Sequence, residues 1–170
     1  AISATIRLHQ FKFSEETGVP PVDRGMLMVY NLGRLDDPKE ENSIFSHSQM
    51  EAYILPQRSY PLELDVALPI FGWTVWLRRN KVLRLVNGLR EMDLLENEWL
   101  QPKGNGLFRV KKSHYFRERY LYAGDVLRPE AVSAETLIEA AHLLHENLPP
   151  ASLRHIALYH ISPQTLEHYE

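Results

Sequence analysis

The chain has 170 residues, of which 44% are hydrophobic and 24% are charged, a composition typical of a globular protein that buries one core. Its formal net charge is −3 and its Lys and Arg residues are scattered along the sequence, so we predict no nucleic-acid partner. The absence of Cys excludes disulfides, thiolate nucleophiles and Cys-ligated zinc. No apolar run reaches the roughly 20 residues of a membrane span. Because the sequence begins with Ala1 and stops inside an expected helix, we expect a trimmed piece of a longer protein.

The first strand is predicted over residues 3–13, where apolar and polar side chains alternate. Ile6 and Leu8 face one way, whereas Arg7 and His9 face the other. This strand therefore has a polar face and brings His9 to its carboxyl end.

A loop and a second strand follow. Residues 14–24 contain Gly18 and two consecutive prolines, which interrupt regular structure. The apolar run of residues 25–33 then predicts a buried strand. Tyr30 and Asn31 lie at the carboxyl end of this strand.

A charged loop and a short helix come next. Residues 33–42 are rich in acidic side chains and are predicted to be a loop. The helix is expected over residues 49–55, with Ser46 or Ser48 as its N-cap and Pro56 as its stop.

Residues 60–76 are the most informative segment, because an acidic side chain lies inside an apolar run that contains too much proline for a helix. Alternation along one strand places Leu64, Val66, Leu68 and Ile70 on one face and Glu63, Asp65, Ala67 and Pro69 on the other. This division suits a barrel strand whose apolar face packs on helices and whose other face leads to an active-site mouth. We therefore expect one buried strand that carries Asp65 into a site.

The remaining elements are predicted from turn signals and helical periodicity. They are a hairpin over residues 74–86 that turns near Arg79 and Asn80, a short helix within 90–99, a turn at 101–106, extended structure over 107–122, a helix over 133–147 capped by Ser133, a buried strand within 153–162, and a helix start at Ser162 and Pro163. Four strands that end in polar or aromatic residues, separated by loops and helices, are typical of βα units. We therefore predict an α/β, barrel-like fold in a single domain of residues 1–170, with an inserted or appended β-hairpin region.

Asp65 is the first candidate for chemistry, because a carboxylate inside a strand needs a partner or a function. Arg7, on the polar face of the first strand, is its expected ion-pair partner, and a purely structural pair is as good an interpretation as a catalytic one. Acid–base cleavage of a glycosidic bond uses two carboxyl groups about 5–10 Å apart, and Glu41 is the best second carboxyl group in this chain. A solvated loop carboxylate is the alternative interpretation of Glu41.

A ligand pocket is predicted from residues at or just past the carboxyl ends of the expected strands, where α/β folds bind ligands. These residues are His9, Tyr30, Asn31, Trp73 and His160. The ring of Trp73 could stack on a sugar, and a core tryptophan is the alternative.

No metal or cofactor is predicted. His142 and His145 are three residues apart on an expected helix, but the HExxH spacing and a third carboxylate ligand are lacking. No Walker, dinucleotide-binding or GxSxG pattern occurs. A divalent metal held by His9 and His160 is a further alternative.

Four segments carry a resemblance to a known family: RLHQFKF, GVPPVDRGMLMVYNLGRLDDPKEENSIFS, YPLELDVALPIFGWTVWLRRNK and LRHIALYHIS. In these segments the chain resembles the C-terminal half of poorly characterised bacterial proteins that are similar to TIM-barrel glycoside hydrolases. Since a complete barrel takes about 250 residues, the resemblance implies a half-barrel or fragment, with any N-terminal catalytic carboxylate outside it. It also implies an exported or cell-envelope location.

The residues and the resemblance together predict a glycoside hydrolase-like domain that acts on or binds a carbohydrate or another small polar ligand. The alternative is a non-catalytic domain that binds a glycan or a protein and in which Arg7 and Asp65 form a structural pair. We also expect association with the remainder of a parent barrel, or self-association, to cover open strand edges.

Overall fold

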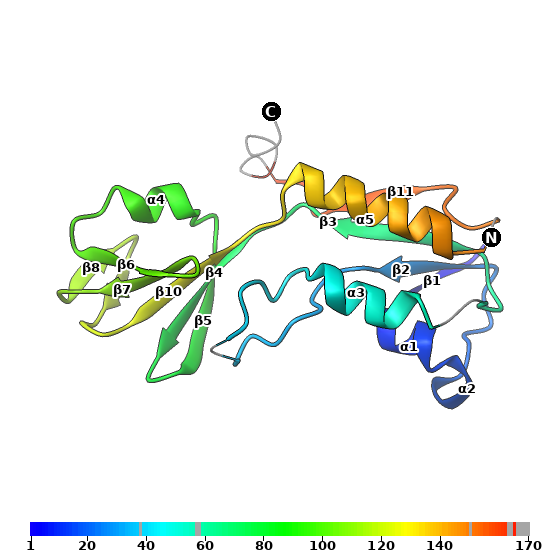
Figure 1. The fold of residues 1–170 in the computed structure, drawn as a ribbon, viewed down its shortest axis with the longest axis horizontal. Coiled ribbons are helices and arrows are strands. Elements are labelled where there is room, and N and C mark those ends of the chain that lie inside the picture. Colours follow the sequence, from blue (N-terminus) through cyan, green and yellow to red (C-terminus); the bar gives the residue numbers. More distant parts are fainter. Residues whose placement is uncertain (38, 57–58, 150, 163–164, 166–170) are drawn as a thin grey trace. The chain divides into compact units, whose positions relative to one another are not determined.

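The computed structural model of the chain describes residues 1–37, 39–56, 59–149, 151–162 and 165. They form a mixed α/β structure (Figure 1) with two compact units. Unit 1 consists of Ala1–Leu32, Ile44–Phe71 and Val132–Glu170, and unit 2 consists of Gly33–Ser43 and Gly72–Ala131. The chain leaves unit 1 twice and returns to it twice, so each unit combines segments that are distant in the sequence.

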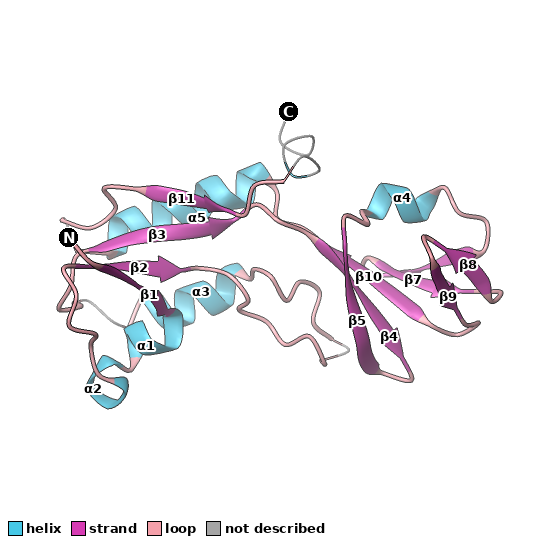
Figure 2. Cartoon of the chain, turned by 180° about the vertical axis from the view of Figure 1, so that it is seen from behind, coloured by secondary structure: helices cyan, strands magenta, loops and turns pink. Residues whose placement is uncertain are grey.

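Unit 1 is built on a four-stranded, fully parallel sheet with strand order β1-β2-β3-β11. Its strands are β1 (Ser3–Arg7), β2 (Arg24–Met28), β3 (Leu64–Pro69) and β11 (Ile156–Tyr159). Its helices are α1 (Leu8–Lys12), α2 (Ser14–Thr17), α3 (His47–Ile54) and α5 (Ala134–Asn147). Helices α1, α3 and α5 lie on one side of the sheet, in front of it in Figure 1 and behind it in Figure 2.

The two faces of this sheet differ as strand alternation requires. The helix-covered face carries the buried apolar side chains Ile6, Leu27, Leu64, Val66 and Leu68. Gly25 lies in the same row as Leu64, and a Cβ atom there would come within 2.6 Å of Leu64 Cδ2, so a glycine allows this close packing. The predicted apolar face of residues 64–70 therefore packs under helices, as expected.

The first predicted strand is too long, because residues 8–12 are helical. The side chain of Gln10 accepts a hydrogen bond from Arg7 N at 3.0 Å, which closes the first turn of α1. Leu8 and Phe11 are both buried, and a spacing of three residues places them on one face of a helix. Strict alternation along a strand would place them on opposite faces. His9 therefore lies in α1 and not at a strand end.

The segment 60–76 forms two strands and not one. β3 ends at Pro69, and β4 (Trp73–Arg78) begins three residues after Ile70 in the other unit. Every residue of β3 is buried, as predicted for an interior strand. Gly72 marks the change of unit, and a Cβ atom there would lie 2.8 Å from the carbonyl oxygen of Glu130.

The C-terminal strand is correctly predicted in position but not in burial. β11 pairs in parallel with β3, yet Ile156, Leu158 and Tyr159 are each about half exposed, at 47%, 53% and 49%. β11 is an edge strand of the sheet, which explains its exposure. The helix start predicted at Ser162 involves Pro163, which lies outside the described residues; Ser162 Oγ accepts a hydrogen bond from Thr165 N at 3.1 Å.

Unit 2 contains a five-stranded antiparallel sheet with strand order β5-β4-β10-β7-β6 and a separate hairpin, β8-β9. Its further elements are β5 (Lys81–Asn87), α4 (Glu91–Leu95), β6 (Leu100–Gly104), β7 (Leu107–Val110), β8 (His114–Phe116), β9 (Arg119–Leu121) and β10 (Val126–Glu130). The predicted hairpin is confirmed: Arg79 and Asn80 connect β4 to β5 with φ angles of 50° and 61°. A core that includes Trp76, Phe108 and Leu127 packs on one face of the sheet.

The central strand β10 is not predicted by the sequence. Its residues include Arg128, Pro129 and Glu130, which together are typical of an exposed loop. In the fold, Arg128 and Glu130 are almost fully buried, at 1% and 4% exposure, and bond to each other. Mutual pairing of the two charges therefore permits a strand that propensity disfavours.

Helix α5 is the longest in the described part of the chain and matches its prediction. Ser133 is the N-cap and its Oγ accepts a hydrogen bond from Thr136 N at 3.2 Å; Leu137, Ala140 and Leu144 form the buried stripe.

Within the described ranges, no helix has the length and apolar character needed to cross a membrane.

We predict that Ser133→Ala lowers the free energy of unfolding by about 1 kcal/mol, because it leaves the Thr136 amide without its capping acceptor. Ser133→Asp is the matched control: its carboxylate can cap the same amide and lies favourably at a helix N-terminus. Urea unfolding of both variants measures the effect. Equal stability of Ser133→Ala and the parent chain would show that the cap contributes nothing.

Candidate functional site

The parallel strands of unit 1 bring four aromatic side chains together at the carboxyl edge of the sheet. Tyr30 follows β2, Phe71 follows β3, Tyr159 ends β11 and His160 follows it. We call these four residues the carboxyl-edge aromatic cluster. The rings of Tyr30 and Tyr159 are stacked, with centroids 5.0 Å apart and planes 9° apart. Phe71 meets both rings edge-on, at 6.0 and 5.9 Å.

The carboxyl-edge aromatic cluster has a buried base and an exposed surface. Phe71 is buried, Tyr30 is half-buried, and Tyr159 is 49% exposed. Burial, followed by the neighbouring Tyr159 hydroxyl, raises the pKa of Tyr30, so its hydroxyl is neutral and can donate a hydrogen bond. His160 and Asn31 are exposed beside it. The cluster can therefore offer a flat ring surface with hydroxyl, amide and imidazole groups at its margin.

Asp65 lies at the opposite end of the sheet. It is the second residue of β3, four residues before Pro69, which at a rise of about 3.3 Å per residue places it about 13 Å from the carboxyl end. Arg24, the first residue of β2, donates to both carboxylate oxygens, from Nε at 3.2 Å and from Nη2 at 3.0 Å. The backbone N–H of His155 also donates to Asp65, at 3.1 Å. Asp65 is 8% exposed, and both of its carboxylate oxygens accept hydrogen bonds.

The charges around Asp65 form one compact cluster at the amino end. Hydrogen bonds from Arg24, together with those from His155, hold the pKa of Asp65 below its usual value despite burial. Arg24 also donates to Glu63, and Arg154 lies 3.5 Å from the same Glu63 carboxylate. Glu63 is thus a second carboxylate near Asp65, but the guanidinium of Arg24 lies between the two. This arrangement is a multiple ion pair and not an open acid–base pair.

The predicted Arg7–Asp65 pair is wrong. The strand register places Thr5 and Met26 in the row of Asp65, whereas Arg7 lies two residues further toward the carboxyl end, in the row of Met28 and Ala67, and β2 separates its strand from β3. Arg7 does point to the same face as Asp65, as alternation predicts, but it is exposed. Arg24 takes its place because it begins the neighbouring strand. The sequence pattern places Arg24 in a loop, which is wrong.

The other predicted site residues are distributed over both units. Tyr30 and His160 come together in the carboxyl-edge aromatic cluster, next to Asn31. Exposed His9 lies in α1, away from the end of β1. Trp73 and Glu41 belong to unit 2, where Trp73 begins β4 and Glu41 is exposed.

Two members of the carboxyl-edge aromatic cluster were missed by sequence reasoning. The sequence pattern predicts Tyr159 inside a buried strand and Phe71 inside one long strand, whereas β11 ends at Tyr159 and β3 ends at Pro69. Both directly follow or end an apolar run of parallel-strand type, and this position is the signal that could have identified them.

A buried polar network in unit 2 holds the loop of residues 33–43. Glu130 accepts hydrogen bonds from Ser43 N at 3.0 Å, from Ser43 Oγ at 2.5 Å and from Trp73 Nε1 at 2.8 Å. Arg128 bonds to Glu130 at 2.7 Å and donates to the carbonyl oxygens of Leu35 and Asp37. The two charges of β10 therefore fix both arms of this loop, and Trp73 is part of the same network.

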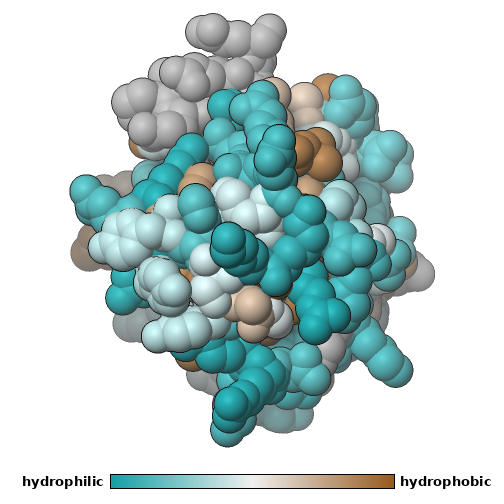
Figure 3. All heavy atoms as spheres, turned by 90° about the vertical axis from the view of Figure 1, so that its left-hand side faces the viewer, coloured by the Kyte–Doolittle hydropathy of each residue, from teal (hydrophilic) through white to brown (hydrophobic). Residues whose placement is uncertain are grey.

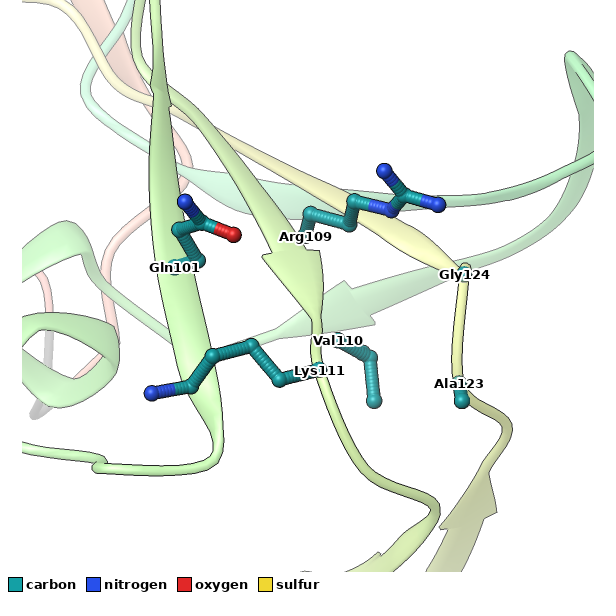
Figure 4. Close-up of a pocket in the computed structure, with 6 residues that line it drawn as sticks. All are labelled: Gln101, Arg109, Val110, Lys111, Ala123 and Gly124. Carbon is teal, nitrogen blue, oxygen red and sulfur yellow. The ribbon is translucent and has the colours of Figure 1, made fainter.

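No metal centre is found among the described residues. No three His, Asp or Glu side chains there are grouped to hold a metal ion, His142 and His145 included. A cavity of about 370 Å³ opens on unit 2 among Gln101, Arg109, Val110, Lys111, Ala123 and Gly124. Figure 4 shows Arg109 and Lys111 extending in opposite directions, so their charges do not converge on one ligand atom.

No model of a known protein family matches the sequence, and no curated protein matches it. Solved structures do match. A chitinase from Chromobacterium violaceum aligns with a TM-score of 0.54 and 12% identity, over 98% of this chain and 53% of the chitinase. The Bacillus subtilis protein ydhD, described as a candidate sporulation-specific glycosylase, aligns with a TM-score of 0.50 and 13% identity, over 92% of this chain and 52% of that one.

A weaker similarity, with a TM-score of 0.48 and 14% identity, links 99% of this chain to 40% of the Bacillus cereus spore cortex-lytic enzyme SleL. The chain thus spans about half the length of the solved proteins that it resembles. At these identities the similarity concerns the fold alone. The chain has a mixed α/β, glycoside hydrolase-like fold.

We predict that Asp65→Asn lowers the free energy of unfolding by about 2–3 kcal/mol, because it leaves Arg24 without its main buried partner. The low pKa of Asp65 contributes stability that is complete above about pH 5 and is lost as the pH falls below about 4, the usual Asp pKa. The variant should therefore show a flatter fall in stability on acidification, measured by urea unfolding between pH 3 and 7.

The control for this prediction is Asp36→Asn, which breaks the exposed Arg34–Asp36 pair. Screening by water makes such a pair nearly neutral, so no measurable loss is expected. Equal losses in Asp65→Asn and Asp36→Asn would contradict a structural role of Asp65.

We also predict that Glu130→Gln speeds hydrogen exchange of the Ser43 amide at least tenfold, because a neutral amide binds Ser43 and Arg128 less strongly than a carboxylate does. The matched control, Glu91→Gln, changes an exposed residue of α4 in the same unit. Exchange measured by NMR or mass spectrometry tests this. Unchanged protection of Ser43 would mean that Glu130 does not hold the loop.

Proposed function

We propose that this chain is a glycoside hydrolase-like domain that binds carbohydrate at the carboxyl edge of its parallel sheet. The observation that carries the proposal is the carboxyl-edge aromatic cluster, in which stacked Tyr30 and Tyr159 rest on buried Phe71. This edge is the usual ligand-binding end of α/β folds. The glycosidase-like fold supports carbohydrate as the ligand class.

The chemistry of the cluster suits a sugar. A pyranose ring has an apolar face of C–H groups that can pack on an exposed aromatic ring, and Tyr159 offers such a ring. Sugar hydroxyls need donors and acceptors nearby, which the Tyr30 hydroxyl, the Asn31 amide and the His160 imidazole supply. We therefore assign Tyr159 to stacking and the other three residues to hydrogen bonding.

We further propose that unit 1 is the C-terminal half of a larger (β/α) barrel. Its four parallel strands are covered by helices on one face only, and Thr5, Arg7, Met26 and Met28 are exposed or half-buried on the other. In a barrel, that second face would be the interior. The coverage of only about half of each solved relative supports the same proposal. The partner surface is then the remaining strands of the barrel, or a second copy of this chain.

Binding is favoured over hydrolysis as the role of this chain's own residues. Asp65 is buried, ion-paired and at the amino end of the sheet, and we propose that it stabilises the fold. Hydrolysis is the second proposal, supported by the fold of the solved relatives. It requires two carboxyl groups about 5–10 Å apart at the carboxyl edge. Exposed Glu41, which belongs to unit 2, stays a prediction from the sequence.

We predict that the full chain binds chitin oligosaccharides, the probe suggested by the chitinase fold, and that Tyr159→Ala weakens binding at least tenfold by removing the stacking ring. Leu158→Ala is the matched control: it truncates a similarly exposed side chain, 53% against 49%, on the opposite face of β11. Isothermal titration calorimetry on the three proteins measures the effect. Binding that is unaffected by Tyr159→Ala, or no saturable binding at all, would contradict the proposal.

A further inference from the structure

The hairpin β8-β9 of unit 2 displays three exposed tyrosines on one face. Tyr115, Tyr120 and Tyr122 are 65%, 47% and 52% exposed. Tyr115 and Tyr120 are directly opposite in the antiparallel pairing, and Tyr122 lies two residues beyond Tyr120. The ring centroids are 6.3 Å apart in the first pair and 5.0 Å apart in the second. We call these three residues the tyrosine row.

A buried ion pair holds one end of the tyrosine row in place. The guanidinium of Arg78 lies 4.4 Å from the ring centroid of Tyr122, within the range of a cation–π contact. Arg78 in turn donates two hydrogen bonds to Asp125, at 2.7 and 2.8 Å, and Asp125 is 1% exposed. Asp125 also accepts from Tyr122 N at 2.9 Å. Both the ring and the backbone of Tyr122 are thus fixed, so little ordering entropy is lost when a ligand binds.

Two exposed lysines lie close to the tyrosine row in the sequence. Lys111 and Lys112 directly precede the hairpin and are exposed, and they have no ion pair or side-chain hydrogen bond among the described residues. Unit 2 as a whole carries 14 Lys and Arg residues against 11 Asp and Glu, whereas unit 1 carries 5 against 11. A ligand of this surface should therefore be anionic.

The character of the surface favours a glycan over a protein. Figure 3 faces the end at which strands β6 to β9 lie in Figure 1, and it shows a largely hydrophilic face with scattered apolar side chains. The core of a protein interface is more apolar and contains less charge. Tyrosine rings combine a stacking surface with a hydroxyl that can bond to sugar hydroxyls.

We infer that the tyrosine row is a second glycan-binding surface, which takes an anionic polysaccharide: sugar rings stack on Tyr120 and Tyr122, and the carboxylates of the chain pair with Lys111 and Lys112. This surface belongs to unit 2 alone and is independent of the carboxyl-edge aromatic cluster. Its ligand is a polymer of uronic acids or of other sugars that bear carboxylates. It would attach the domain to acidic polysaccharide without requiring any reaction there.

The test uses the full chain and a defined oligomer of galacturonic acid, with binding measured by isothermal titration calorimetry. We expect saturable binding that weakens with rising salt. Tyr120→Ala and Tyr122→Ala should each weaken binding about tenfold or more, whereas Tyr120→Phe, which keeps the ring, should bind within about twofold of the parent chain. Lys111→Ala with Lys112→Ala should weaken binding and reduce its salt dependence.

Two controls test whether the tyrosine row itself binds the galacturonate oligomer. Leu83→Ala, at a 47% exposed position of β5 in the same unit, should leave binding unchanged. Tyr159→Ala should also leave galacturonate binding unchanged, and Tyr120→Ala should leave chitin-oligosaccharide binding unchanged, so that the two sites can fail separately. Thermal melts verify folding, and Tyr115→Ala replaces any variant that does not fold.

Three results would overturn the inference. They are the absence of saturable galacturonate binding, unchanged affinity in Tyr120→Ala and Tyr122→Ala, and equal affinity for an uncharged oligomer of the same length. Loss of galacturonate binding in Tyr159→Ala would show a single site at the sheet edge and would equally exclude a separate surface on unit 2.

Discussion

Parallel pairing of β1, β2, β3 and β11 is the constraint on which the rest of this structure depends. Parallel strands cannot be joined by tight turns, so every connection must cross back over the sheet, and here the crossovers bring helices to one face. All four carboxyl ends then meet at one edge. The connection from β3 to β11 is where the chain builds most of unit 2 before α5 completes the crossover. The parallel topology thus gathers the strand ends that carry the aromatic cluster and leaves a long connection in which most of unit 2 is inserted.

Buried ion pairs have comparable structural roles in the two units. Arg24 and Asp65 link the amino ends of the parallel strands β2 and β3. Arg128 and Glu130 hold the loop of residues 33–43 against β10. Burial of each charge costs several kcal/mol, which is offset only when nearly every donor and acceptor is used, as in both clusters. Such pairs add little net stability, but the loss of one member is expensive. They therefore fix strand register and loop position more than they raise stability.

Features that depend on local sequence were predictable, and features that depend on distant partners were not. The Ser133 cap and the turn at Arg79 follow from neighbouring residues, and the structure confirms both. The strand predicted over residues 25–33 is present as β2, but it ends at Met28, and only Gly25 and Leu27 within it are buried. The sequence of β10 is typical of a loop because it contains two charges and a proline. Those charges can be buried in a strand because they bond to each other and to the distant loop of residues 33–43. The identity of the partner of Asp65 depends on strand order and register: β2 pairs with β3 and β1 does not, so Arg24 reaches Asp65 and Arg7 does not.

The position of Asp65 shows why an acid in an apolar strand is weak evidence for catalysis. Asp65 lies at the amino end of β3, opposite the usual ligand-binding edge, and accepts hydrogen bonds from Arg24 and from the His155 amide. These bonds lower the pKa of Asp65, whereas a general acid needs a raised pKa. At the other end of the same strand, Phe71 carries no charge but supports two stacked tyrosines. A sugar bound there would be held by ring contacts and neutral hydrogen bonds. The proposed sugar contacts and the ion pairs of Asp65 thus lie at opposite ends of β3, and the sequence pattern of the strand alone does not distinguish them.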